Sequence, residues 1–254
     1  MENLPKNIEK IVAGKAYSLD QTGMSGAKIL CFDRMVLKIE KTSEEADNEA
    51  RMLVWLQNRL PVPEVIAFER YGGFNFLLES RMPGKMSCDK TLTAGEVIPI
   101  LAQGLERLWA LDISGCPYVN DSANKLKLIG RRAALGGLGG ISGAEPETYG
   151  ENGFSSPEAL FAWLQENQPE EDLVFSHGDY CLPNVFVDQG KLSGFIDLGR
   201  GGAADQWQDI ALCVRSLSHN FGEDSRHAES LLKRLGLDPD PQKMKYYLLM
   251  DELF

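Results

Sequence analysis

Long hydrophobic runs are missing from this 254-residue chain, because charge or glycine interrupts every apolar stretch. The stretches stop well short of the roughly 18 residues that a membrane-spanning helix needs. Residues 1–11 carry charges throughout and contain no apolar segment of signal-peptide length, which speaks against secretion. The five cysteines are scattered without a C-x-x-C pair, as is typical of the reducing cytosol. We therefore expect a cytoplasmic protein that does not associate with membranes.

Basic residues are also in short supply. The chain has 26 Lys and Arg against 37 Asp and Glu, which gives a formal net charge of -11 at pH 7. It shows no basic patch of the kind that binds nucleic acid, so we expect no nucleic-acid partner. An acidic surface instead attracts cationic small molecules. No internal repeats are evident, and the length fits one two-lobed enzyme, expected to be a monomer or weak dimer.

Three polar residues in the second half of the chain have a spacing that suits phosphoryl transfer. Asp179 precedes Asn184 by five residues, and Asp197 follows Asn184 by thirteen. An apolar strand at 173–175 comes before them, and alternating apolar residues over 185–195 predict a hairpin that brings Asn184 and Asp197 together. The spacing alone also occurs by chance, but this ordered context favours a site. We predict Asp179 as the base that receives the hydroxyl proton, and Asn184 and Asp197 as ligands of Mg²⁺.

A lysine strand and a helical acid precede this motif in the chain. Residues 35–39 are β-rich with Lys38 in their alternation, and a helix is expected over 43–60. Glu49 shares a helical face with apolar residues and is the acid that we expect beside Lys38, with Glu45 as the alternative. The competing interpretation is a surface lysine and a set of solvated acids. The order of strand, lysine, helix and acid favours the pair.

A loop of small residues lies upstream of Lys38. Residues 22–28 include Gly23, Ser25 and Gly26. Such residues let backbone N–H groups and the Ser25 hydroxyl approach phosphate groups. The loop lacks the G-x-G-x-x-G pattern, and its glycines would serve any tight turn equally well. Its position ahead of Lys38 favours a role over the phosphates.

Together these motifs resemble those of the aminoglycoside 3′-phosphotransferases, the antibiotic-resistance branch of the protein-kinase-like fold. The resemblance extends from about Thr22 to Phe254. The segments that carry it are 23–25, 36–38, 60–63, 177–184, 195–200, 209–211 and 251–254.

The resemblance implies an α+β, bilobal fold. A small antiparallel sheet with one main helix is expected over 1–82, the nucleotide-binding lobe, with a hinge at about 79–82. Within the hinge, the backbone of Ser80 and Met82 is expected to meet the adenine edge. The larger lobe, 83–254, is expected to be mostly helical and to carry catalysis and substrate binding. Its helices are predicted at 94–111, 121–134, 157–166, 205–217, 224–235 and 241–254.

The implied reaction is direct in-line transfer of the γ-phosphoryl group of ATP to a hydroxyl of an aminoglycoside, expected to be the 3′-hydroxyl, which inactivates the antibiotic. GTP stays open as a second donor. On the nucleotide side, Lys38 and Glu49 would orient the α- and β-phosphates and Ser25 would touch the β-phosphate. On the substrate side, the resemblance implies Arg200, Arg215, Asp251, Glu252 and the terminal carboxylate of Phe254.

The chain departs from the family pattern just beyond Arg215. Relatives tend to carry acids there, whereas this chain has His219 and Asn220. A protonated His219 would repel an ammonium group, which favours an alternative: a kinase of another small hydroxylated metabolite. A third interpretation is a nucleotide-binding module without catalysis. The complete set of nucleotide-side residues speaks against that module.

Overall fold

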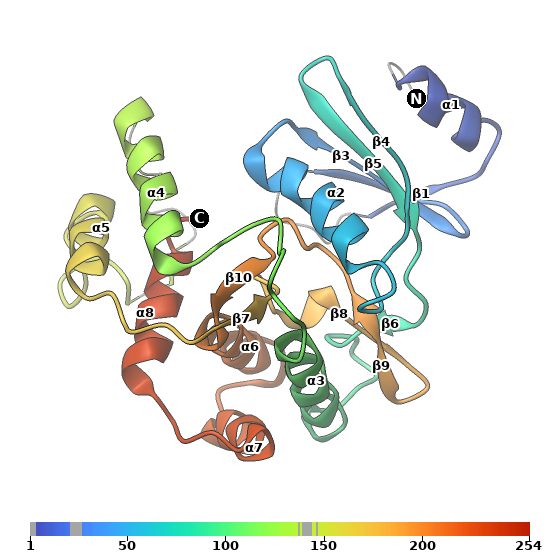
Figure 1. Cartoon of the computed structure of the whole chain (residues 1–254). Coiled ribbons are helices and arrows are strands. Elements are labelled where there is room, and N and C mark those ends of the chain that lie inside the picture. The colour runs from blue at the N-terminus through green and yellow to red at the C-terminus, as the bar shows by residue number, and fades with distance from the viewer. Residues whose placement is uncertain (1–3, 21–26, 137, 139–143, 146) are drawn as a thin grey trace. The chain divides into compact units, whose positions relative to one another are not determined.

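The computed structural model describes residues 4–20, 27–136, 138, 144–145 and 147–254 (Figure 1). It divides into two compact units, one formed by 1–89 with 183–201 and the other by 90–182 with 202–254. The predicted α+β class is confirmed, with antiparallel sheet in the first unit and mainly helices in the second.

The first unit is built on an antiparallel sheet of five strands in the order β1-β2-β3-β5-β4. The strands are β1 (Ser18–Asp20), β2 (Lys28–Cys31), β3 (Met35–Lys41), β4 (Val65–Tyr71) and β5 (Phe74–Ser80). The β4–β5 hairpin turns at Gly72 and Gly73, whose φ angles are 60° and 82°. Positive φ at both turn positions is the requirement of a type I′ turn, which explains the glycine pair.

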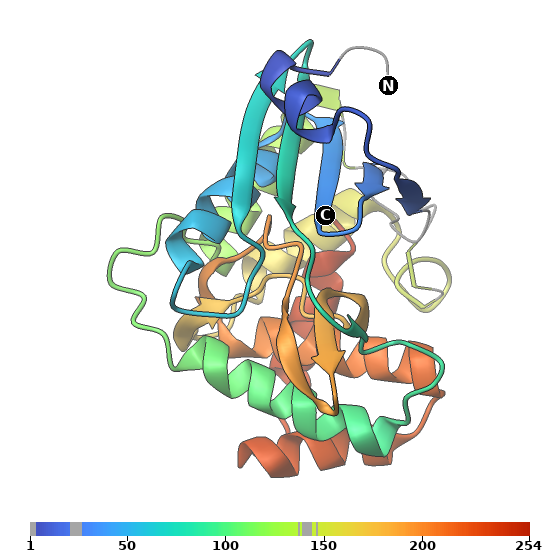
Figure 2. The same ribbon diagram turned by 90° about the vertical axis from the view of Figure 1, so that its right-hand side faces the viewer.

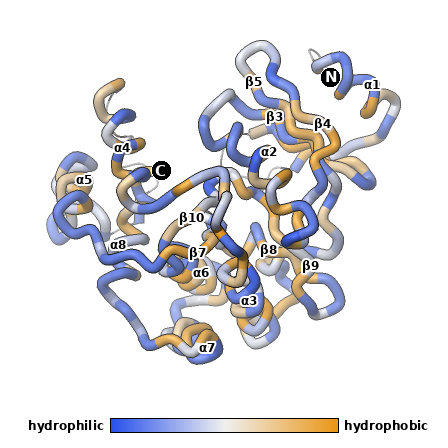
Figure 3. The backbone as a smooth tube through the Cα atoms, viewed as in Figure 1, coloured by the Kyte–Doolittle hydropathy of each residue, from blue (hydrophilic) through white to orange (hydrophobic). Residues whose placement is uncertain are grey.

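Two helices cover opposite faces of this sheet. Helix α1 (Lys6–Val12) buries Ile8 and Val12 in a cluster with Leu37, Phe76 and Leu78, and lies beside the teal strands of Figure 2. The sequence did not predict α1, because seven residues with two buried positions are too short for a periodicity to register. Apolar residues of the strands labelled β3 and β4 appear as orange stretches of the tube in Figure 3.

Helix α2 (Glu44–Leu56) packs on the other face of the sheet, against β4 and β5. It begins at Ser43, whose side chain accepts a hydrogen bond from the Ala46 N–H at 3.0 Å. It ends at Leu56, earlier than the predicted residue 60. The reason is that Gln57 has an extended ψ of 131° and Asn58 a left-handed φ of 63°, neither of which a helix can contain.

A second, three-stranded sheet completes the first unit. It pairs β6 (Lys85–Met86), β8 (Val185–Asp188) and β9 (Lys191–Phe195) in the order β6-β8-β9. The predicted β8–β9 hairpin is confirmed, whereas the two-residue β6 was not foreseen. Because β8 pairs with β6 and the Phe195 N–H donates to the Pro61 carbonyl at 3.0 Å, the segment 183–201 groups with residues that precede position 89.

The second unit contains the six predicted helices. They are α3 (Ala94–Trp109), α4 (Ser122–Gly136), α5 (Pro157–Glu166), α6 (Gln206–Phe221), α7 (Ser225–Leu235) and α8 (Pro241–Asp251). Strands β7 (Leu173–Ser176) and β10 (Gly202–Asp205) form an antiparallel pair beside them, and β10 was not predicted. Helix α6 packs against α8, and α3 against α7. Tyr246 and Tyr247 on α8 are buried. None of the described helices combines the length and apolar character of a membrane span.

Candidate active site

Three carboxylates from different segments of the first unit surround the ammonium group of Lys38. Its Nζ lies 2.7 Å from Glu49 Oε2 on α2 and 2.8 Å from Asp197 Oδ1 beyond β9. Glu40, two residues further along β3 and therefore on the same face of the strand, has its Oε1 at 3.6 Å. The structure therefore brings together Lys38, Glu49 and Asp197, three residues that the sequence singles out for nucleotide and metal binding.

This cluster is buried, and burial determines its charges. Burial by itself would lower the pKa of Lys38, but the carboxylates of Glu49, Asp197 and Glu40 raise it well above the ordinary value. Burial raises the pKa of Glu49 to about 7, against the opposing effect of Lys38. Lys38 is therefore a cation at physiological pH, and its hydrogen bonds to Glu49 and Asp197 fix its position. A buried, positioned cation is what a phosphate group requires.

The β8–β9 hairpin positions both predicted metal ligands. Asn184 directly precedes β8 and Asp197 follows β9 by two residues, and the Ile196 N–H donates to the Asn184 carbonyl at 3.0 Å. Asn184 is buried, whereas the Asp197 side chain is 42% exposed. Asp197 has φ of 60°, a left-handed conformation that is uncommon for residues other than glycine. One amide and one carboxylate oxygen donor fit Mg²⁺, which takes few protein ligands and completes its shell with water and phosphate.

Glu45, the alternative partner for Lys38, instead binds Arg200. The Arg200 Nε lies 3.0 Å from Glu45 Oε1. Between them Gly199 passes so close to α2 that a Cβ there would lie 2.9 Å from Glu45 Cγ. Arg200 belongs to the first unit, whereas the other residues predicted for substrate binding belong to the second.

The predicted hinge begins inside β5, because Ser80 is the last residue of that strand. Ser80 is bonded twice to Glu64: its N–H donates to the Glu64 carbonyl and its Oγ accepts from the Glu64 N–H, each at 2.9 Å. Met82 is buried, and Gly194 lies so near its sulfur that a Cβ would come within 2.7 Å. The N–H and hydroxyl of Ser80 and the side chain of Met82 are thus already engaged within the first unit. Ser25, predicted at the β-phosphate, lies outside the described residues.

In the second unit, Asp209 holds the backbone that leads into Asp179. Asp209 is fully buried on α6, and its carboxylate accepts hydrogen bonds from the Ser176 Oγ at 2.9 Å, the His177 N–H at 2.7 Å and the Gly178 N–H at 2.9 Å. Burial raises the pKa of Asp209, and these donors oppose that effect. Asp209 lies in 209–211, one of the segments that carry the family resemblance. Its anchoring role had no local signal, because its partners lie more than thirty residues earlier in the chain.

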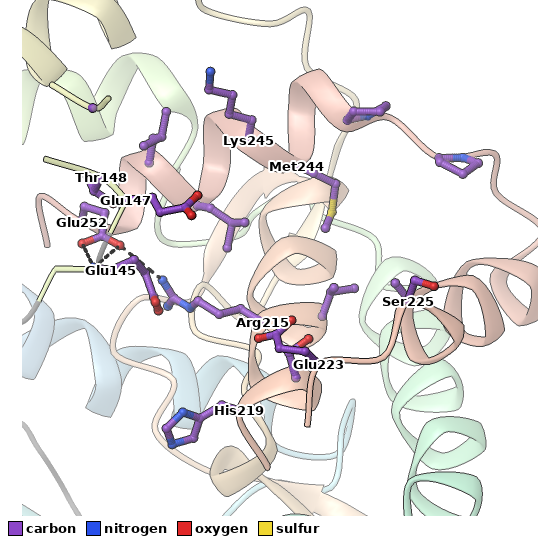
Figure 4. Close-up of a pocket in the computed structure, with 18 of the residues that line it drawn as sticks. Glu145, Glu147, Thr148, Arg215, His219, Glu223, Ser225, Met244, Lys245 and Glu252 are labelled. Atoms are coloured by element: carbon purple, nitrogen blue, oxygen red, sulfur yellow. Dashed lines mark hydrogen bonds and ion pairs between the residues drawn. The ribbon is translucent and has the colours of Figure 1, made fainter. Parts of the chain in front are cut away.

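A cavity of about 1150 Å³ opens in the second unit between α6, α7, α8 and residues 145 and 147–153 (Figure 4). Arg215 projects into it and forms ion pairs with Asp251 and with Glu252, whose Oε1 lies 4.0 Å from Arg215 Nη1. The acidic residues that line the cavity are Glu145, Glu147, Glu151, Glu223, Glu229, Asp240 and Glu252.

The cavity joins residues that the sequence predicted with residues that it did not. Arg215 and Glu252 line it as members of the predicted substrate set, and His219 lines it one helical turn beyond Arg215. Glu223 was missed, because an acid in a short helix connection carries no periodic pattern. The ring of Phe254 lies elsewhere in this unit, with Lys125 Nζ 5.1 Å and Arg132 Cζ 5.2 Å from its centre.

Comparison with known proteins identifies the family. Residues 22–247 match the model of the phosphotransferase enzyme family. An aminoglycoside 3′-phosphotransferase of Enterococcus faecalis is 38% identical over 266 residues, covering 99% of this chain and 97% of the relative.

Two solved structures extend the comparison to the fold. The crystal structure of aminoglycoside-3′-phosphotransferase of type VIII superposes with a TM-score of 0.84 at 27% identity, covering 98% of this chain and 97% of that one. An aminoglycoside phosphotransferase from Streptomyces rimosus, in complex with ADP and streptomycin, shares the fold with a TM-score of 0.81 at 23% identity, covering 100% of this chain and 99% of that one. The chain therefore has the protein-kinase-like fold and belongs to the aminoglycoside 3′-phosphotransferases of the phosphotransferase enzyme family, which are ATP-dependent enzymes acting on hydroxyl groups.

Proposed function

We propose that this protein transfers the γ-phosphoryl group of ATP to the 3′-hydroxyl of an aminoglycoside. The observation that carries the proposal is the pairing of Lys38 with both Glu49 and Asp197, at 2.7 and 2.8 Å. It joins a phosphate-binding cation to the acid that orients it and to a carboxylate suited to Mg²⁺. The relatives named above support the choice of acceptor.

On the nucleotide side, the Lys38 ammonium group binds phosphate oxygens while Glu49 keeps it in place. Asn184 and Asp197 would hold Mg²⁺, which supplies positive charge for the phosphates when it is bound. The Asp197 carboxylate is already oriented by its hydrogen bond from Lys38 and by the left-handed backbone at that residue. The arrangement is preorganised, so little of it has to move when the nucleotide binds.

Asp179 is proposed as the base. Its carboxylate accepts the proton of the acceptor hydroxyl as the hydroxyl oxygen forms a bond to the γ-phosphorus. The bond between the γ-phosphorus and the bridging oxygen breaks, and ADP leaves with that electron pair. The three hydrogen bonds to Asp209 support this role, since they fix the backbone of residues 176–178 immediately before the base.

On the substrate side, the acidic cavity suits a polycation. Arg215 is already neutralised by Asp251 and Glu252, so the remaining acids present unbalanced negative charge to a ligand. Ammonium groups of an aminoglycoside would pair with these carboxylates. The terminal carboxylate of Phe254 is proposed as a further partner, and Arg200 as a residue that shapes the pocket.

One observation favours a second candidate, a kinase of a less cationic hydroxylated metabolite. His219 lines the cavity at a position where a protonated imidazole would repel an ammonium group. Such an enzyme would use the same nucleotide residues and differ only in its acceptor.

The test is steady-state turnover of Mg²⁺-ATP with kanamycin, which has a 3′-hydroxyl, and tobramycin, which lacks it, with product mass determined for each. We expect a phosphorylated product from kanamycin and none from tobramycin. Phosphorylation of tobramycin would contradict the 3′ assignment. Failure with both, while Mg²⁺-ATP still binds, would favour the metabolite kinase.

A further inference from the structure

Glu79 is a buried acid that the proposed mechanism does not use. It is the penultimate residue of β5, and its exposed fraction is 8%. In the pairing of β3 with β5, Val36 lies opposite Glu79 and Lys38 lies opposite Leu77. Side chains alternate between the faces of a sheet, so Glu79 shares the face of Lys38. This face is opposite to the one that α1 covers.

Within the described residues, no hydrogen bond or ion pair to the Glu79 carboxyl group is found. Burial raises the pKa of Glu79 well above its ordinary value, and the neighbouring Glu49 raises it further. A neutral carboxyl group has one O–H donor and one carbonyl acceptor, the same pattern as a glutamine amide. No described side chain or backbone group occupies this carboxyl group, so it is suited to a ligand on the Lys38 face.

The neighbours of Glu79 show which part of a nucleotide it would meet. Ser80 follows it directly, and Met82 lies two residues further on, at the segment proposed above to meet the base. In the part of the chain that the structure describes, the buried Met82 N–H has no acceptor. Lys38, on the same face as Glu79, is the proposed phosphate ligand. Glu79 therefore lies between Lys38, proposed to bind the phosphates, and the hinge residues expected to meet the adenine ring.

We propose that Glu79 selects the purine base of the nucleotide, an inference that rests on the proposed ATP site. Its carbonyl oxygen accepts a hydrogen bond from the exocyclic N6 amino group of adenine, and its O–H donates to the ring nitrogen N7. Glutamine and asparagine side chains read adenine in the same bidentate way. Guanine presents two acceptors at that edge, so one of the two bonds is lost and the Glu79 carbonyl faces an oxygen. Glu79 thereby favours ATP over GTP.

The inference is tested by measuring the dissociation constants of Mg²⁺-ATP and Mg²⁺-GTP for the full chain and three variants. Glu79→Gln keeps the donor and acceptor pattern, whereas Glu79→Leu removes it. Glu69→Leu is the matched control, because Glu69 lies opposite Phe76 and hence on the other face of the same sheet. Melting temperatures establish that each variant is folded. Binding is measured without an aminoglycoside, so a wrong acceptor assignment leaves this result unaffected.

We expect the wild type, Glu79→Gln and Glu69→Leu to prefer ATP by similar factors. In Glu79→Leu we expect that preference to shrink about tenfold or more, since a bidentate base contact discriminates by roughly that amount. An unchanged ratio in Glu79→Leu overturns the inference, as does an equal loss of both affinities, which would indicate a structural role. A glutamine variant that behaves like the leucine variant overturns it too.

Discussion

The Nδ2 of Asn48 donates hydrogen bonds to two backbone carbonyls, those of Gly199 at 2.8 Å and Gly201 at 3.0 Å. Asn48 precedes Glu49 on α2, and the two carbonyls follow Asp197. One buried amide thus ties the helix that carries the acidic partner of Lys38 to the segment that carries the proposed metal ligand. These bonds fix the position of the segment relative to the helix, although about 150 residues separate them in the chain.

Asn48→Ala is therefore expected to destabilise the first unit. The change leaves two buried carbonyls without donors, and each such loss costs about 1–3 kcal/mol. Urea unfolding should show a lower free energy of unfolding by at least about 1 kcal/mol. Val54→Ala is the control on the same helix, because Val54 is 62% exposed and its truncation should change stability by less than about 0.5 kcal/mol. Equal stability of the two variants would contradict the anchoring role.

Asp179→Asn should lower kcat by about 10²–10⁴-fold while the KM for ATP changes little, because the amide cannot accept the hydroxyl proton and no nucleotide contact is removed. Steady-state kinetics with saturating acceptor measure both constants. Asp188→Asn makes the same chemical change at an exposed residue of the β8–β9 hairpin and should leave kcat unaffected. Near wild-type turnover of Asp179→Asn would remove Asp179 from the role of base.

Asp197→Ala should raise the Mg²⁺ concentration needed for half-maximal nucleotide binding by at least about tenfold. The expectation follows because even residues that only support a metal ligand contribute 10- to 100-fold to affinity. Nucleotide binding is titrated with Mg²⁺ by calorimetry. An unchanged Mg²⁺ requirement would show that Asp197 serves Lys38 alone, through their 2.8 Å hydrogen bond.

His219→Glu should lower the KM for an aminoglycoside by about two- to fivefold, the range of an exposed ion pair. The new carboxylate would add an ammonium partner to the acidic wall of the cavity that His219 lines. Lys191→Gln changes the net charge by the same amount at an exposed hairpin position outside that lining and should have no effect. A higher KM in His219→Glu would favour the metabolite kinase.

Stability should fall more steeply with rising pH in the wild type than in Glu79→Gln. The pKa of Glu79 is raised in the folded protein, so the folded state holds a proton that the unfolded state loses near pH 4.5. The contribution of this group is fully present below that pH and is lost as pH rises toward the raised pKa. Urea unfolding at several pH values from 4.5 upward measures both slopes. Parallel slopes would indicate that Glu79 is charged in the folded state.

Much of this protein was determined by short-range patterns in its sequence. The alternation around Lys38, the helical periodicity of the predicted helices and the hairpin signal between Asn184 and Asp197 predicted element types and most boundaries, because propensity and periodicity act within a few residues. The order of strand, lysine, helix and acid favoured Glu49 as the partner of Lys38, and the spacing from Asn184 selected Asp197 separately. The structure places both carboxylates within hydrogen-bonding distance of Lys38.

Only the tertiary structure decided the partners that come from distant parts of the chain. It paired Glu45 with Arg200, placed Asp209 beneath the backbone that precedes Asp179, and left Glu79 buried on the face of Lys38. No short-range sequence pattern indicates any of these relationships, since each depends on how the sheet, the hairpin and the helices pack. Burial, which sets the charge of Glu49 and Glu79, is likewise a property of the packed unit and cannot be assigned to a residue in the unfolded chain.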